Sequence, residues 1–155
     1  MATLTVTHTE NITIEGRQQG STKAIRYENI SDVYSRVFSF KQGVLTRLYT
    51  TTADTVSGGV FDDGSIKYVR ITNLGNEAIV INIILETSTL AYAYEIQPNE
   101  SYYLYSHTLA AFADNDDAIT TTELGASLSD IDEIKAYCHR APGKVDVFIA
   151  STDAK

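Results

Sequence analysis

The sequence predicts an all-β protein: an antiparallel β-sandwich, jelly-roll-like, with about ten strands in a single domain over residues 1–155. Alternating, β-branched segments recur from end to end, and each is bounded by turn residues. Helical periodicity is scarce, and only the stretches 107–113 and 127–134 are expected to hold a helical turn. Many short strands with frequent turns are typical of a sandwich or barrel.

Strands with one apolar face follow one another through the first half of the chain. They are expected at 3–8, 11–16, 23–28, 32–40 and 43–50. In the first strand Leu4 and Val6 alternate with threonines. In the fourth, Val33 and Val37 lie on the face opposite to three aromatic residues, because successive side chains of a strand point to opposite sides.

Three β-hairpins are predicted in the second half, each with a four-residue polar turn. They join 67–72 to 78–86, 91–96 to 101–106, and 133–139 to 144–151. Their turns contain the Asn, Gly and Pro that chain reversals favour. Val80 and Ile84 make both faces of strand 78–86 apolar, which predicts a central strand covered on both sides.

The apolar positions at period two in these strands define the expected core. These positions are Val69, Ile71, Ile79, Ile81, Ile83, Leu85, Val145, Val147 and Ile149. A chain of 155 residues is long enough to bury such a core within one domain.

Charge, hydropathy and cysteine content narrow the class of protein. The formal net charge is −8, and the twelve lysines and arginines are scattered singly, so no nucleic-acid partner is predicted. The longest apolar run falls far short of the ~20 residues of a membrane span, so no membrane partner is predicted. A single cysteine and a start without a signal-peptide pattern predict a protein made in cytoplasm.

Three acidic stretches are candidate cation sites or turn formers. The first comprises Asp114, Asn115, Asp116 and Asp117, and it invites a calcium hypothesis because hard cations take several oxygens from one loop. It lacks the EF-hand order, so we expect a solvated loop. The second, Asp62 and Asp63, is expected in a turn. The third is expected to cap a helical turn and comprises Asp130, Asp132 and Glu133.

Reactive constellations are not recognisable in the sequence. His8, His107 and His139 have no metal-ligand spacing, and one cysteine cannot supply a zinc set. Cys138 is expected in mid-strand as a buried, inert thiol. Neither a nucleophile elbow nor a glycine-rich phosphate loop is present. The sequence therefore predicts no enzyme activity, no metal and no cofactor.

Tyrosine is the strongest compositional signal, with ten tyrosines and no tryptophan. Five of them fall in the predicted hairpin 91–106, and they are Tyr92, Tyr94, Tyr102, Tyr103 and Tyr105. Cross-strand aromatic pairs that stabilise the sheet are one interpretation. A protein interface is a second, since tyrosine offers a large contact area with a polar tip. A carbohydrate platform is a third.

Several stretches together resemble a known group of proteins. They are "TLTVTHTENITIEG", "NISDVYSRVFSF", "YVRITNLGNEAIVINI", "AYEIQPNESYYLYS" and "KVDVFIAS". With them the chain resembles small virion proteins of tailed bacteriophages, particularly marine ones. The resemblance implies a β-sandwich on the capsid surface, as a decoration or cement protein, or at the neck or tail. It transfers no catalytic residue.

A structural role in a virion is therefore the expected function. The resemblance implies a chain made in the host cytoplasm that stabilises the particle by contacts with the major capsid protein or other virion proteins. A homo-oligomer, dimer or trimer, is expected. The candidate contact segments are Ala2–Gly16 and the long polar loops 50–65 and 113–127. A neck or tail component and a lectin-like carbohydrate-binding sandwich remain alternatives.

Overall fold

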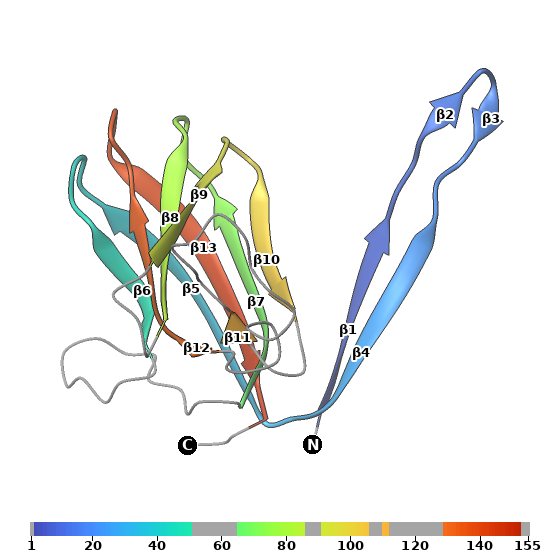
Figure 1. Ribbon diagram of the computed structural model, residues 1–155, viewed down its shortest axis with the longest axis horizontal. Coiled ribbons are helices and arrows are strands. Elements are labelled where there is room, and N and C mark those ends of the chain that lie inside the picture. Colours follow the sequence, from blue (N-terminus) through green and yellow to red (C-terminus); the bar gives the residue numbers. More distant parts are fainter. Residues whose placement is uncertain (1, 51–64, 86–90, 106–109, 112–128, 153–155) are drawn as a thin grey trace, which may run out of the picture.

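The computed structural model describes residues 2–50, 65–85, 91–105, 110–111 and 129–152. These residues form strands and no helix (Figure 1). The strands are β1 (Ala2–Thr9), β2 (Thr13–Ile14), β3 (Arg17–Gln18), β4 (Thr22–Ile30), β5 (Asp32–Phe40), β6 (Thr46–Thr50), β7 (Ile66–Asn73), β8 (Ile79–Leu85), β9 (Ala91–Ile96), β10 (Ser101–Tyr105), β11 (Ala110–Ala111), β12 (Ser129–Tyr137) and β13 (Gly143–Ser151).

Two antiparallel sheets pack face to face and form the body of the molecule. One sheet has the strand order β10-β7-β13-β5. The other has the order β6-β12-β8-β9, and β11 pairs with the start of β12. Most steps along the chain cross from one sheet to the other, which is the arrangement of an eight-stranded jelly roll. The predicted fold class is confirmed.

The core lies between the two sheets, where the period-two residues of both meet. Eight of the nine predicted core residues are at most 1% exposed, and the side chain of Leu85 lies outside the described residues. Further buried residues of this cluster are Phe40, Leu48, Tyr49, Ile66, Ile96, Ile131, Ile134, Ala136 and Cys138. Strand β8 is central, between β12 and β9, as predicted, and its second face is half-buried at Val80 and Ile84.

The three predicted hairpins are wrong. Strands β7 and β8, β9 and β10, and β12 and β13 are each joined by a short turn, but the two strands of each pair belong to different sheets. A short polar turn can reverse the chain within a sheet or carry it to the facing sheet, and the side-chain alternation is the same in both cases. The buried side chain of Asn73 donates to the carbonyl oxygen of Glu77 in the β7–β8 turn and to that of Ile96 at the end of β9.

Two further expectations for local structure are corrected. The expected helical turn at 127–134 is replaced by strand β12, which pairs with β8 and β6. Of the expected turn at 107–113, the structure describes Ala110 and Ala111 only, and they form strand β11. Both stretches carry enough β-branched or small residues to pair with a neighbouring strand once one is present.

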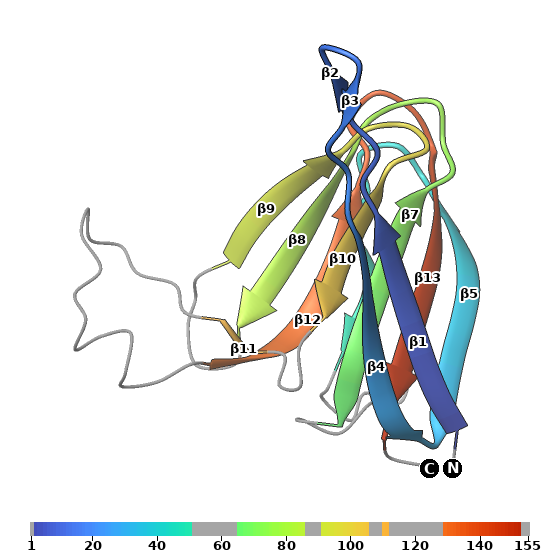
Figure 2. The ribbon, with the colours of Figure 1, turned by 90° about the vertical axis from the view of Figure 1, so that its right-hand side faces the viewer.

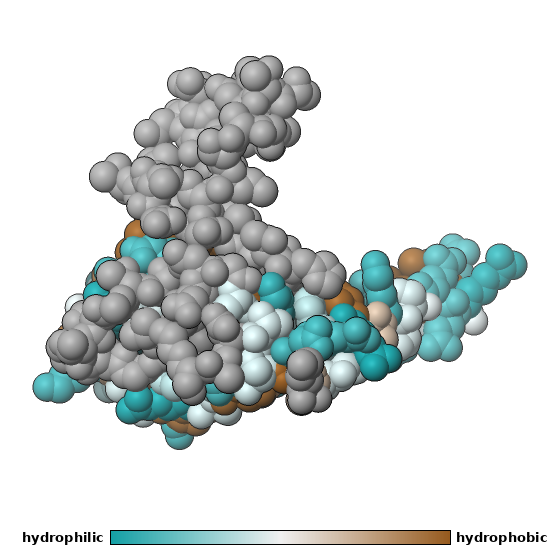
Figure 3. Space-filling view, turned by 90° about the horizontal axis from the view of Figure 1, so that it is seen from below, coloured by the Kyte–Doolittle hydropathy of each residue, from teal (hydrophilic) through white to brown (hydrophobic). Residues whose placement is uncertain are grey.

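Residues 2–30 form a separate hairpin outside the sandwich. Strand β1 pairs with β4, and the short strands β2 and β3 continue the hairpin to its tip. We call residues Ala2–Ile30 the arm. It lies over the outer face of sheet β10-β7-β13-β5 and diverges from this sheet toward the tip (Figures 1 and 2). Seen from below, it forms a narrow, mostly hydrophilic extension of the body (Figure 3).

Candidate functional site

The arm has one apolar face and one threonine-rich face. In its ladder Leu4 is opposite Tyr27, and Val6 is opposite Ile25. These side chains pack toward the sandwich, while the threonines of β1 point to solvent. The alternation in the sequence therefore predicts both the strand and the face that is buried.

The tip of the arm is a tight turn that requires unusual backbone conformations. Glu15 and Gly16 have φ values of 50° and 76°, and positive φ at both central residues is the feature of a type I′ hairpin turn. Below the tip the strands come very close at Gly20, where a Cβ atom would lie 1.8 Å from the carbonyl oxygen of Glu10. Only glycine fits there.

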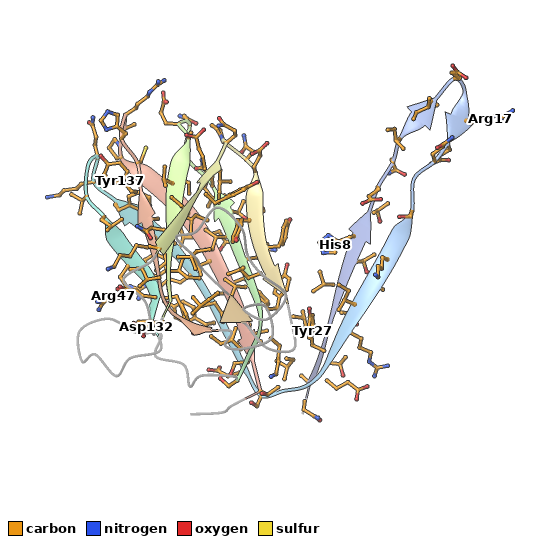
Figure 4. All side chains as sticks on the ribbon, viewed as in Figure 1. His8, Arg17, Tyr27, Arg47, Asp132 and Tyr137 are labelled. Carbon is orange, nitrogen blue, oxygen red and sulfur yellow. The ribbon has the colours of Figure 1, made fainter. Side chains whose placement is uncertain are left out.

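Two large apolar side chains are exposed near this tip. Ile12 is 51% exposed and Ile14 is 49% exposed. Arg17 lies at the far end of the arm, away from the sandwich (Figure 4). The neighbouring side chains are polar, so the isoleucines stand out as the apolar contact points of the tip.

The base of the arm is held by a small hydrophobic cluster of its own. Its buried members are Tyr27 and Ile30 of β4, Tyr68 of β7 and Ala150 of β13. Partly buried residues complete the cluster, and they are Leu4, Val6, Ile25 and Phe148. The arm thus covers the outer face of β7 and β13 but contributes no residue to the larger core between the sheets.

Aromatic rings connect the arm to the sheet. The rings of Tyr27 and Tyr68 are 6.5 Å apart, and Tyr68 lies 6.5 Å from Tyr103. His8 meets the ring of Tyr103 edge-on at 5.6 Å. His8 and Tyr27 extend from the arm toward the sandwich (Figure 4). Burial raises the pKa of the Tyr68 phenol, and the charge of nearby Arg70 opposes this shift only in part.

A charged pair lies beside this cluster on the same face of the sheet. Arg70 donates a hydrogen bond from Nη2 to Oδ2 of Asp146 over 2.8 Å. Its guanidinium also lies 5.5 Å from the ring centroid of Phe148. Farther across the face, Val33 and Val37 of the edge strand β5 are about half exposed, so the arm covers the middle of this sheet and leaves its β5 margin open.

The five tyrosines of the predicted hairpin 91–106 are divided between strands β9 and β10, which belong to different sheets. Tyr94 and Tyr102 come from facing sheets and their rings are 4.9 Å apart, so this pair bridges the two layers. Tyr103 contacts the arm. The side chains of Tyr92 and Tyr105 lie outside the described residues. The ladder expected on one hairpin is therefore split between two sheets.

The described histidines lie in two different hollows. His8 lines one of about 310 Å³ on the arm, together with Glu10, Ser21 and Lys23. His139 lines another of about 410 Å³ at the turn end of the sandwich, beside Glu77, Glu95 and Arg140. His107 lies outside the described residues. Within the described part of the chain no group of three His, Cys, Asp or Glu side chains is placed to bind a metal.

The predictions for the three acidic stretches have different outcomes. Residues 62–63 and 114–117 lie outside the described residues, as does the side chain of Asp130. Asp130, Asp132 and Glu133 were expected to cap a helical turn, and this is wrong because all three are in strand β12. The buried carboxylate of Glu133 forms ion pairs with Arg47 and with Lys135, whose Nζ is 2.5 Å from Oε2. Charge pairing between strands β6 and β12 explains why this acid tolerates burial.

Cys138 is buried as predicted, but the expected mid-strand position is wrong, because β12 ends at Tyr137. Its side chain is 1% exposed, and the Sγ–H donates to the carbonyl oxygen of Ala78 over 3.5 Å. Among the described residues there is no helix long and apolar enough to cross a membrane.

Sequence reasoning placed Ala2–Gly16 among the contact segments but did not predict the arm. The turn pair Glu15-Gly16 between two alternating strands is the signal that could have revealed it, since glycine after a polar residue favours a two-residue hairpin turn. The other two candidate contact loops, apart from Thr50 and Ser65, lie outside the described residues. Comparison of the chain with protein-family models, with curated proteins and with solved structures gives no match in any of the three.

Proposed function

We propose that this chain is a structural virion protein of a tailed bacteriophage that stabilises the particle through protein–protein contacts, most directly as a capsid decoration or cement protein. The observation that carries the proposal is the arm. Strands β1 and β4 form a two-stranded sheet outside the sandwich, so each has one edge without a neighbouring strand among the described residues. A two-stranded hairpin is marginally stable by itself, and exposed strand edges pair readily with another chain.

The arm tip offers an apolar contact to a partner. Complete burial of an isoleucine side chain contributes about 1.5–3 kcal/mol, so the exposed halves of Ile12 and Ile14 can add about 2 kcal/mol per arm. Such a contact is weak for one copy. On a particle that presents many equivalent sites, linked copies hold far more tightly than each contact alone. Small gains repeated over a shell suit a cement protein.

The fold and the sequence resemblance also support a role in the virion. Jelly-roll sandwiches occur in viral capsid domains and in lectins, which is an analogy at the level of the fold. The resemblance of the sequence to small virion proteins favours the first of these. In this role the partner is the major capsid protein or another virion protein, and the chain acts without catalysis, metal or cofactor.

A lectin-like function is the second candidate. The side chain of Tyr94 is 53% exposed at the side of the sandwich, beside Tyr102. An exposed aromatic ring can stack on a sugar. Binding of the wild-type chain to a glycan array, lost in Tyr94→Ala and kept in an arm-tip variant, would favour this function over assembly.

A charged arm tip tests the assembly proposal. The double variant Ile12→Asp/Ile14→Asp removes the apolar contact and leaves the base of the arm unchanged. In the virus–host system that encodes the chain, we expect at least about tenfold fewer copies on purified particles, since each 1.4 kcal/mol changes an affinity about tenfold. Quantitative mass spectrometry gives the copy number.

Val44→Asp is the matched control. Val44 is 47% exposed but lies in the turn before β6, so this variant should be incorporated like the wild type. Hundreds of wild-type copies per particle indicate the capsid surface, and about a dozen indicate the neck or tail. If the wild-type chain never co-purifies with particles, the virion proposal is wrong. If the tip variant is incorporated fully, the contact lies elsewhere.

A further inference from the structure

The connection between the arm and the sandwich is very short. Strand β4 ends at Ile30 and β5 begins at Asp32, so Ser31 alone separates them. Asn29, two residues earlier, has a φ of 61°, but it belongs to the bulge in the β1–β4 ladder and therefore to the arm itself. The backbone N–H of Ser31 is held by the carbonyl oxygen of Ser151 over 3.0 Å. The chain therefore folds back sharply at a single-residue hinge, Ser31.

The arm and the sandwich are stabilised by separate clusters. The core between the sheets contains no arm residue, so it stays closed whether or not the arm is docked. The arm cluster, by contrast, buries Tyr27 and Ile30 against Tyr68 and Ala150. Lifting the arm exposes both sides of this cluster to water. The apolar face of the arm therefore needs a sheet to cover it, but nothing in the contact requires that sheet to belong to the same chain.

We infer that copies of this chain exchange arms. The arm of one protomer docks on the outer face of β7 and β13 of a second copy, and the arm of the second copy docks on the first in the same way. All contacts of the docked arm are then kept, and only the hinge changes. Short hinges favour this exchange, because the closed form must reverse the chain at one residue, whereas opening extends β4 and β5 into one strand.

The charge distribution permits the exchange. The arm contains three acidic residues, Glu10, Glu15 and Glu28, and three basic ones, Arg17, Lys23 and Arg26. The net charge of −8 therefore resides outside the arm. The neutral arm itself therefore adds no net repulsion when it docks on a negative second copy. Arm exchange rests on the proposed assembly function, because assembly gives the exchange a purpose. It deepens that function by naming a second copy of the chain as the partner that the base of the arm contacts.

Single-cysteine chains of two kinds test the exchange. In a Cys138→Ser background, one chain carries His8→Cys and the other Tyr103→Cys, at positions whose rings are 5.6 Å apart across the arm–sheet contact. The two chains, distinguished by a mass tag, are unfolded, mixed and refolded together. Exchange brings the cysteine of one chain next to that of the other, so oxidation should give a covalent heterodimer.

The matched control joins two positions within the sandwich. One control chain carries Tyr94→Cys and the other Tyr102→Cys. The rings of these two tyrosines are 4.9 Å apart within one wild-type chain. Both belong to the sandwich, so exchange of the arm cannot bring position 94 of one chain next to position 102 of another. We expect at least about fivefold more heterodimer from the 8/103 mixture than from the 94/102 mixture. Equal yields would overturn the inference.

The wild-type chain provides a second measurement that needs no cysteine variant. Sedimentation velocity should show a species of twice the 17.0 kDa chain mass at high concentration. Insertion of two glycines after Ser31 lengthens the hinge, so we expect dimerisation to weaken at least about tenfold. A wild type that is monomeric at every concentration contradicts exchange. The variant Ile12→Asp/Ile14→Asp should still exchange arms, so loss of particle binding and loss of exchange are distinguishable.

Discussion

The side-chain amide of Asn73 donates a hydrogen bond to the carbonyl oxygen of Ile96 over 3.1 Å and so ties the end of β7 to the end of β9 in the facing sheet. The same Nδ2 donates to the carbonyl oxygen of Glu77 over 2.9 Å. The Oδ1 accepts from the backbone N–H of Gly75, also over 2.9 Å. Asn73 is 0% exposed, so one buried amide closes this end of the sandwich.

Asn73→Ala should therefore be strongly destabilising. It removes three hydrogen bonds of about 0.5–1.5 kcal/mol each and leaves a buried carbonyl without its donor, so we expect a loss of about 2–4 kcal/mol in the free energy of unfolding. Urea denaturation measures it. Asn76→Ala, at an exposed position in the same turn, is the control and should stay within about 0.5 kcal/mol of the wild type. A loss below about 1 kcal/mol for Asn73→Ala would contradict the role of this amide.

A pair of isoleucine substitutions separates the core from the arm tip. Ile81 is 0% exposed, and Ile81→Ala should cost about 2–5 kcal/mol because it leaves a cavity between the sheets. Ile12→Ala makes the same chemical change at the tip and should alter the free energy of unfolding by less than about 0.5 kcal/mol. Similar losses for both variants in chemical denaturation would show that the tip is packed in solution.

Ionisation of Tyr68 should destabilise the protein at high pH. Burial raises the pKa of this phenol in the folded state above that in the unfolded chain, so the folded state holds its proton more tightly. The unfolded state then releases more protons as the pH rises above about 10, and the free energy of unfolding falls. Tyr68→Phe should lower this alkaline loss, measured as the slope of stability against pH. An unchanged slope would assign the loss to other tyrosines.

Chelation should leave the fold unaffected. The stretch 114–117 is interpreted as a solvated acidic loop, so EDTA is not expected to change the melting temperature measured by calorimetry. A fall in melting temperature that calcium restores would instead identify a cation site among these residues.

The sequence predicts the strands of the sandwich well because burial imposes a period of two. Ile79, Ile81 and Ile83 alternate with residues of the other face, and this pattern alone placed them in the core. The assignment of strands to sheets could not be predicted in the same way. The turn after Asn73 looks like a hairpin turn, and its inter-sheet role depends on hydrogen bonds to residues distant in the sequence, such as Ile96.

The arm escaped prediction for a related reason. Leu4 and Val6 alternate with threonines as they would in any half-buried strand, and the pattern does not state which sheet covers them. In β5 the separation of Val33 and Val37 from the aromatic residues was predicted, but the pattern did not indicate which of the two faces is exposed. Whether a strand lies inside a sandwich or on its outside depends on its partners rather than on its own residues.

The order of synthesis has a consequence for the arm. Its ladder runs from Thr9–Thr22 to Ala2–Ile30 and is local, so it can close in about 1–10 μs once these residues emerge. The face that it covers needs β13, which begins at Gly143 and follows on the order of ten seconds later at usual translation rates. During this interval the finished arm has no docking face in its own chain, whereas chains already released from the same messenger present one. The spacing of ribosomes is then a variable that sets how often an arm is captured by another copy.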